Sequence, residues 1–78
     1  MRVLLFAGLA EAVGSRELLL PGTLPAATAG ELESALRQRY PALARALFRV
    51  AVNREYAAAG RTLLDGDEIA LIPPVSGG

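Results

Sequence analysis

The chain has 78 residues, of which 53 % are hydrophobic and 21 % charged, so it suits one small globular domain. Eight basic and eight acidic residues balance, and the sequence contains no basic cluster that would indicate a nucleic acid or an anionic membrane as partner. Cys and His are absent, which excludes disulfides, thiolate nucleophiles and the commonest general base and metal ligand, so we expect neither a metal site nor self-contained catalysis.

The first twenty residues predict two short strands. Residues 2–7 are apolar at nearly every position, which is typical of a strand covered on both faces. Residues 9–13 can form a helical turn closed by Gly14, and residues 17–20 predict a second strand that stops at Pro21-Gly22. Adjacent short strands usually pair antiparallel, and we expect that pairing here.

The N-terminal residues also have some features of a signal peptide. Arg2 is followed by an apolar run and by the small-residue pattern Ala10-Glu11-Ala12, but the basic region is minimal. No apolar run approaches the ~20 residues of a membrane span. We therefore expect a cytoplasmic protein with no membrane partner.

The clearest helix signal begins at Thr28. Thr28 and Glu31 fit a capping box, in which the Thr28 hydroxyl accepts from the Glu31 amide and the Glu31 side chain reaches back. Apolar residues then recur at helical spacing: Leu32, Ala35, Leu36 and Tyr40. Pro41 ends this helix or begins another turn. The helix has one apolar stripe, so it can cover only one face of a sheet.

Three more strands are predicted in the second half of the chain. Residues 49–53 and 55–58 flank a turn at Asn53-Arg54. Asp65-Gly66 is a tight-turn signature that leads into the last strand, at residues 68–72.

This order of elements predicts an α+β fold of the β-grasp (ubiquitin-like) type. It consists of a small mixed sheet with one main helix packed across one face, and the first and last strands are inner neighbours. We place this β-grasp domain at residues 1–72 and an extended C-terminal tail at residues 73–78. The last strand would then project the tail from the rim of the sheet.

Strand parity predicts what the uncovered face of the sheet carries. One alternate set of side chains on the first strand would face the helix: Val3, Leu5 and Ala7. Leu4 and Phe6 then point the other way, and Ile72 lies beside Phe6. Since one helix cannot cover this face, we expect Leu4, Phe6 and Ile72 to form an exposed apolar patch that binds a partner. Alternatively, the loop at residues 60–64 folds over the patch.

Few other charged residues suggest a site. Asp65 and Asp67 resemble a carboxylate pair, although turn formation explains them better. Arg2, Arg54 and Arg61 can pair with acidic groups of a partner, while solvation is the simpler interpretation.

The tail combines stiffness with a small cross-section: Pro73, Pro74, Val75, Ser76, Gly77 and Gly78. The prolines favour an extended path, and the glycines carry no side chain. Such a tip suits a narrow channel, in which it presents a carboxylate to another protein's active site. A terminus that is merely unordered is the plainer alternative.

Several segments together resemble the small subunit of molybdopterin synthase, the MoaD type of sulfur carrier: Val52–Glu55, Asp65–Ala70 and Ile72–Gly78. The opening strand with Phe6 and the segment at residues 9–14 also resemble this family, so the likeness spans the chain. The ending Pro-Pro-Val-Ser-Gly-Gly is its specific part, because many ubiquitin-like carriers share Gly-Gly. Residues 57–59, three alanines, are blander than the corresponding hairpin of the family.

The resemblance implies a sulfur carrier in molybdenum cofactor biosynthesis that binds no cofactor itself. A MoeB-type activating enzyme, related to ubiquitin-activating enzymes, would use ATP to adenylate Gly78. A sulfur donor protein would then supply the sulfur for a C-terminal thiocarboxylate, 1-thioglycine. The loaded tail would enter the active site of the large, MoaE-type subunit and give its sulfur to the pyranopterin precursor. The remaining tail residues would thread that site: Pro73, Pro74, Val75, Ser76 and Gly77.

Other functions fit part of the same pattern. A sulfur carrier of the thiazole (thiamine) pathway or a ubiquitin-like protein modifier would share the fold and Gly-Gly. A protein-binding β-grasp module with an irrelevant tail is a further possibility. An enzyme acting alone is disfavoured, and the expected enzymatic role is that of the sulfur-donating subunit in a sulfurtransferase complex.

Overall fold

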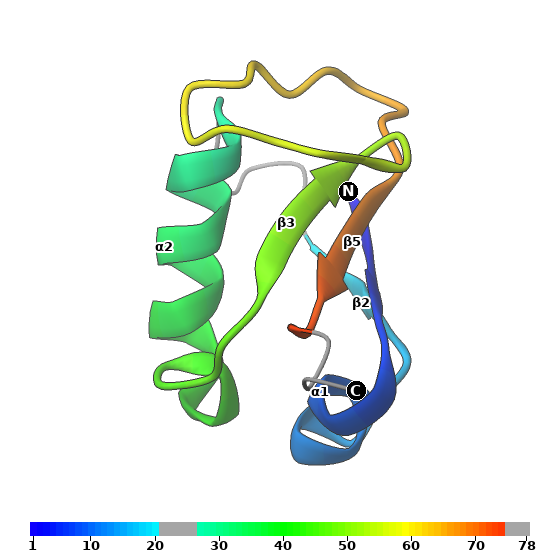
Figure 1. Ribbon diagram of the computed structural model, residues 1–78, viewed down its shortest axis with the longest axis vertical. Helices are drawn as coiled ribbons and strands as arrows, with labels where there is room; N and C mark the ends of the chain where they lie inside the picture. Colours follow the sequence, from blue (N-terminus) through cyan, green and yellow to red (C-terminus); the bar gives the residue numbers. More distant parts are fainter. Residues whose placement is uncertain (21–26, 75–78) are drawn as a thin grey trace.

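The computed structural model describes residues 1–20 and 27–74. Their strands form one mixed sheet in the order β2-β1-β5-β3-β4. The strands are β1 (Arg2–Leu5), β2 (Glu17–Leu19), β3 (Arg49–Val52), β4 (Glu55–Tyr56) and β5 (Ile69–Ile72). Helix α2 (Ala29–Arg39) crosses one face of the sheet, and the shorter α1 (Ala7–Val13) follows β1 (Figure 1). This arrangement confirms the predicted β-grasp fold.

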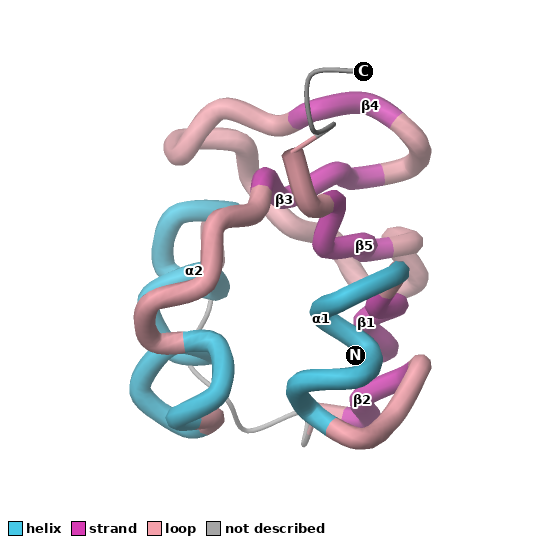
Figure 2. The backbone as a smooth tube through the Cα atoms, turned by 60° about the horizontal axis from the view of Figure 1, so that its bottom comes forward, coloured by secondary structure: helices cyan, strands magenta, loops and turns pink. Residues whose placement is uncertain are grey.

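The first and last strands lie side by side at the centre of the sheet. β1 runs parallel to β5 and antiparallel to β2, and β5 pairs antiparallel with β3. Figure 2 shows the strands in this order along one wall of the molecule. Val3 lies opposite Ile69 and Leu5 opposite Leu71, so the inward side chains of the two central strands are matched in register.

The core lies between the sheet and α2. Leu32 and Leu36 of the helix are fully buried, as are Val3, Ile69 and Leu71 of the two central strands. A short 3-10 turn, η1 (Pro41–Leu43), follows α2 and adds buried Leu43 to the same core. Pro41 is the first residue of η1, which is the second of the two alternatives that the sequence left open.

The N-terminus of α2 is capped somewhat differently from the prediction. The Thr28 hydroxyl accepts a hydrogen bond from the Glu31 amide at 3.3 Å, as expected. The Glu31 carboxylate reaches back, but it accepts a hydrogen bond from the Thr28 hydroxyl at 3.1 Å. The neighbouring Ala29 amide donates to the carbonyl of Arg61, so a loop distant in sequence helps to cap the helix.

Two expectations about the chain after β1 are corrected. The first strand ends at Leu5, and the following helix begins at Ala7, two residues earlier than predicted. Ala7 is exposed, with a φ of 49°, and does not face α2. The chain leaves the sheet at this point. Leu9 of α1 is buried in the core, where the prediction had placed Ala7 of a longer first strand.

The loop after β4 lies against α2 and leaves the open face of the sheet uncovered. The Leu63 amide donates to the Ala27 carbonyl, and Leu63 itself is buried in the core. Ala59 of this loop packs closely against α2 at Gly30. A Cβ at position 30 would lie only 3.0 Å from the Ala59 Cβ, so the absence of a side chain there permits the contact. The alternative in which residues 60–64 fold over the apolar patch is therefore wrong.

No helix within residues 1–20 and 27–74 combines the length and the apolar character needed to cross a membrane.

Candidate docking face and tail root

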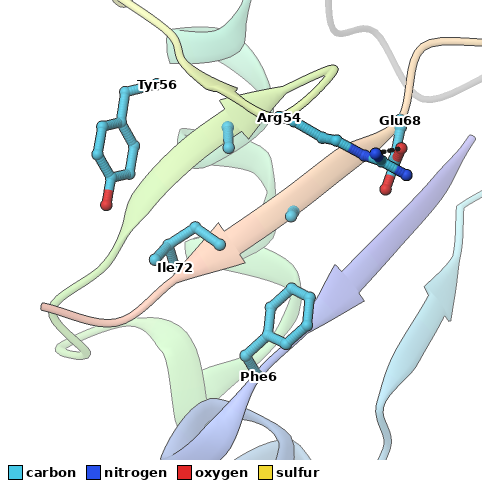
Figure 3. A pocket seen from close by; sticks show the side chains of 7 residues that line it. Phe6, Arg54, Tyr56, Glu68 and Ile72 are labelled. Carbon is cyan, nitrogen blue, oxygen red and sulfur yellow. Dashed lines mark ion pairs between the residues drawn. The ribbon is translucent and has the colours of Figure 1, made fainter. Parts of the chain in front are cut away.

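The open face of the sheet carries a shallow groove of about 490 Å³. It lies on the side of the sheet opposite α2, which is visible behind the strands in Figure 3. The residues that line it come from β3, β4, β5 and the segments beside the strands, including the one between β1 and α1: Phe6, Ala51, Arg54, Tyr56, Glu68, Ala70 and Ile72. The lining is mainly apolar, with charged side chains at one end.

The pleat of the strands explains the shape of this groove. On β5, Ile69 and Leu71 point into the core, so Ala70 and Ile72 point outward. Ala51 of β3 lies directly opposite Ala70. Two methyl side chains in register form a low floor between larger neighbours.

Two aromatic side chains stand at either side of this floor. Phe6, directly after β1, is 47 % exposed, and Tyr56 of β4 is 56 % exposed. Ile72 of β5 lies between these two aromatic side chains in Figure 3. A partner's apolar side chain placed over Ala51 and Ala70 would therefore contact aromatic surface on both sides.

The structure brings together two of the three residues predicted to bind a partner. Phe6 and Ile72 both line the groove. Leu4 is half-buried and lies opposite Ala70 in the β1–β5 pairing, but it does not belong to the groove lining. The sequence reasoning missed Tyr56, although the β3–β4 register that places it opposite Ala51 follows from a two-residue turn at Asn53-Arg54.

Charged side chains define the rim of the groove. The Arg54 Nε lies 3.6 Å from a carboxylate oxygen of Glu68, with both side chains largely exposed. Arg49, which is paired with Ile72 in the β3–β5 ladder, places its guanidinium 4.1 Å from the centre of the Tyr56 ring. Among the described residues, Arg49 has no ion-pair partner. Arg54 and Glu68 thus line the groove with opposite charges, and Arg49, stacked on the lining residue Tyr56, adds a positive charge beside it.

A hydrogen-bonded network fixes the turn that carries Arg54. The Asn53 side-chain amide donates to Asp67 at 2.9 Å, and the Glu68 amide donates to the Asn53 side-chain oxygen at 2.9 Å. The other Asp67 carboxylate oxygen accepts from the Leu64 amide at 2.8 Å. These bonds attach the tip of the β3–β4 hairpin to the turn before β5.

The same hydrogen bonds show that Asp67 is a structural residue of the turn. The hydrogen bond from the Leu64 amide, followed by that from the Asn53 side chain, lowers the pKa of the Asp67 carboxyl below its ordinary value of 3.8. Asp67 therefore stabilises the turn as a carboxylate, in agreement with the prediction that turn formation explains the Asp65-Gly66-Asp67 sequence. Within the part of the chain that the structure describes, no three His, Cys, Asp or Glu residues are grouped to hold a metal ion.

The groove continues into the root of the tail. Ile72 both lines the groove and ends β5, and the half-buried Pro73 and exposed Pro74 follow it. The remaining predicted tail residues lie outside the described residues: Val75, Ser76, Gly77 and Gly78. A protein that covers the groove would thus meet the start of the tail at the end of the same strand.

Comparison with known proteins identifies relatives over nearly the whole chain. The model of the ThiS family matches residues 3–78. The molybdopterin synthase sulfur carrier subunit of Dictyostelium discoideum is 36 % identical, covering 99 % of this chain and 94 % of that protein. The crystal structure of SAMP1 from Haloferax volcanii is 40 % identical, with a TM-score of 0.79, and the match covers 99 % of this chain and 97 % of that one.

One similar structure contains a partner. The complex of subunits 1 and 2 of the molybdopterin-converting factor from Helicobacter pylori includes a chain that is 28 % identical, with a TM-score of 0.69. The match covers 99 % of this chain and 96 % of that one.

Proposed function

The chain belongs to the ThiS family of sulfur carriers, and on this premise we propose that it is the sulfur-carrying small subunit of molybdopterin synthase. The observation that carries the proposal is the apolar groove on the open sheet face, which runs into the tail root at Ile72. A carrier needs a surface on which an enzyme docks. It also needs a reactive end that enters the active site of that enzyme when the two proteins dock. The groove and the Pro73-Pro74 stalk supply these two parts on one strand.

The proposed chemistry takes place at Gly78. A carboxylate is a poor electrophile, so one of its oxygens first attacks the α-phosphorus of ATP on an activating enzyme, which releases pyrophosphate and leaves an acyl-adenylate. Sulfur at the oxidation level of sulfide, supplied by a donor protein, then displaces AMP and forms the thiocarboxylate. On the large subunit, this sulfur attacks a carbon of the pyranopterin precursor as that carbon's bond to oxygen breaks, and the displaced oxygen takes up a proton. Water attacks the acyl carbon as its bond to sulfur breaks, and the Gly78 carboxylate is restored.

The chain's own residues position the reacting group and leave the proton transfers to its partners. The sequence contains no His, Cys or Lys, and its basic residues are all Arg, which stay protonated. Gly77 permits the backbone to pass where a Cβ would clash, and Pro73 and Pro74 set the reach of the tail. A large-subunit partner is supported by the Helicobacter pylori complex of two molybdopterin-converting-factor subunits, and we propose that this partner docks on the groove.

A second function has specific support. SAMP1 of Haloferax volcanii is named small archaeal modifier protein 1, and its crystal structure is 40 % identical in sequence to this chain. A modifier would use the same first step, after which an amine of a target protein would displace AMP and form an amide bond. The two functions differ only in the nucleophile that reaches the activated Gly78 carbonyl.

The intact mass of the protein isolated from its own cells separates these functions. A fraction heavier by the difference between one sulfur and one oxygen atom, located at Gly78 by fragmentation, is expected for the carrier. A variant lacking Gly78 is the matched control and should show no such fraction. Amide-linked conjugates together with complete absence of the thiocarboxylate under sulfur-replete conditions would support the modifier and contradict the carrier.

A further inference from the structure

Arg54 occupies a backbone position that favours glycine. Asn53 and Arg54 form the two-residue turn between β3 and β4, with φ values of 52° and 69°. Two consecutive positive φ values are those of a type I′ turn, in which Asn-Gly is the preferred pair. Asn tolerates this conformation, whereas the Cβ of a long side chain is crowded in it. Arg54 is therefore a strained choice for the second position.

Contacts within the molecule do not account for an arginine here. The Arg54 side chain is 87 % exposed, and its ion pair with Glu68 spans 3.6 Å between partly solvated groups. Exposed pairs of this kind contribute little to folding, because water and ions screen them. The turn itself is fixed by the side chain of Asn53 and by backbone bonds, none of which involves the Arg54 side chain.

The position of the side chain gives it a different use. Arg54 extends from the turn toward Glu68 along the rim of the groove, and both residues line it (Figure 3). Arg49 does not line the groove itself, but it stacks on Tyr56, which does, and so adds one positive charge beside the Arg54–Glu68 pair. A partner seated on the apolar floor would complement this rim with a carboxylate. Local backbone strain at a residue whose side chain faces a binding surface is a common sign of function.

We propose that Arg54 is a specificity-determining residue that pairs with a carboxylate of the large synthase subunit when this subunit docks over the groove. The inference rests on the proposed function and adds the chemistry of the partner surface: an apolar side chain over Ala51 and Ala70, with an acidic residue beside it. Glu68 holds the Arg54 guanidinium at the rim until the partner's carboxylate replaces it. The strained arginine is thus explained by the complex rather than by the free domain.

The test compares the binding of the large subunit from the same genome to wild type and to Arg54→Gly. Glycine relieves the strain, so the melting temperature should rise by about 3 °C. The dissociation constant should nevertheless increase about fivefold, mainly through slower association, and the salt dependence should weaken. Arg54→Lys retains the charge and should restore most of the affinity. Arg45→Ala removes an exposed arginine that does not line the groove and should leave binding unchanged.

The outcomes distinguish this inference from the proposed function. If Arg54→Gly binds as tightly as wild type, the arginine has no role in docking and the inference is overturned. If the variant weakens only the activating enzyme, the carboxylate belongs to that protein and the inference is also overturned. Failure of the wild-type chain to bind the large subunit would refute the proposed function itself. Glu68→Gln should bind at least as tightly as wild type, whereas weaker binding would show that the Glu68 charge is the recognised group.

Discussion

Phe6→Ala tests whether the groove is a docking surface or a part of the core that happens to be exposed. Phe6 is 47 % exposed, so folding already buries about half of its surface. Complete burial of a phenylalanine contributes up to about 3 kcal/mol, so truncation should reduce the free energy of unfolding by about 1.5 kcal/mol. For a domain of this size, such a loss lowers the melting temperature by about 6–12 °C.

The effect of the same substitution on binding should be larger. Docking buries the other half of the ring against the partner, and a central aromatic contact of this kind contributes about 2 kcal/mol, so the dissociation constant should rise about thirtyfold. Calorimetric titration with the large subunit and urea unfolding measure the two effects separately. Leu47→Ala is the matched control: Leu47 is 75 % exposed but does not line the groove, and both quantities should barely change.

A larger loss of stability on Phe6→Ala would contradict a docking role for this residue. A fully buried phenylalanine costs about 3–5 kcal/mol when it is replaced by alanine, because a cavity remains. A loss of this size, accompanied by unchanged affinity of the molecules that stay folded, would show that Phe6 belongs to the core and that the groove is not the docking surface.

Three further changes address the tail, the turn before β5 and the N-terminus of α2. One extra residue after Gly78 should abolish sulfur transfer in a reconstituted synthase assay while the melting temperature stays that of wild type; retained transfer would contradict the tail mechanism. Asp67→Asn should lower stability at neutral pH, and because the Asp67 pKa is below 3.8, the difference from wild type should vanish as the pH falls through that pKa. A difference that persists at lower pH in urea titrations would show that charge is not the cause. Gly30→Ala should destabilise the fold by up to about 2 kcal/mol, because an overpacking cost of about 1–3 kcal/mol against Ala59, 3.0 Å from the new Cβ, is only partly offset by the gain of about 1 kcal/mol in helix propensity. Ala59→Gly in the same chain should recover part of the loss, and absence of recovery would place the strain elsewhere.

The sequence predicted the fold because its local signals agree with one another. The apolar run of β1, the cap at Thr28 and the alternation before Ile72 each predicted the correct kind of element. One further argument, that a single helix covers a single face, predicted an open surface containing Phe6 and Ile72. These features depend on side-chain periodicity, which is written directly in the chain.

Other features of the site depend on three-dimensional contacts that periodicity does not contain. The groove requires Ala51 and Ala70 in register, and this depends on the pairing of β3 with β5. The strain at Arg54 appears only with the φ value of the turn. The helix α1 begins as early as Ala7 because this start places Leu9 in the core. A β1 strand that continued through Ala7 would not bury Leu9.

The arrangement of the groove and the tail places a physical limit on how the carrier functions. Under the proposed function, the groove would change little between the loaded and the unloaded carrier, because oxygen would be exchanged for sulfur at Gly78, six residues beyond Ile72. Contacts at the groove therefore contribute nearly equally to both states, and a ligand that binds two states equally does not shift the balance between them. A tight groove would retain the spent carrier as firmly as the loaded one. Repeated loading thus favours a small, partly polar docking face such as this one, and discrimination between loaded and spent carriers must come from contacts that the partner makes with the end of the tail.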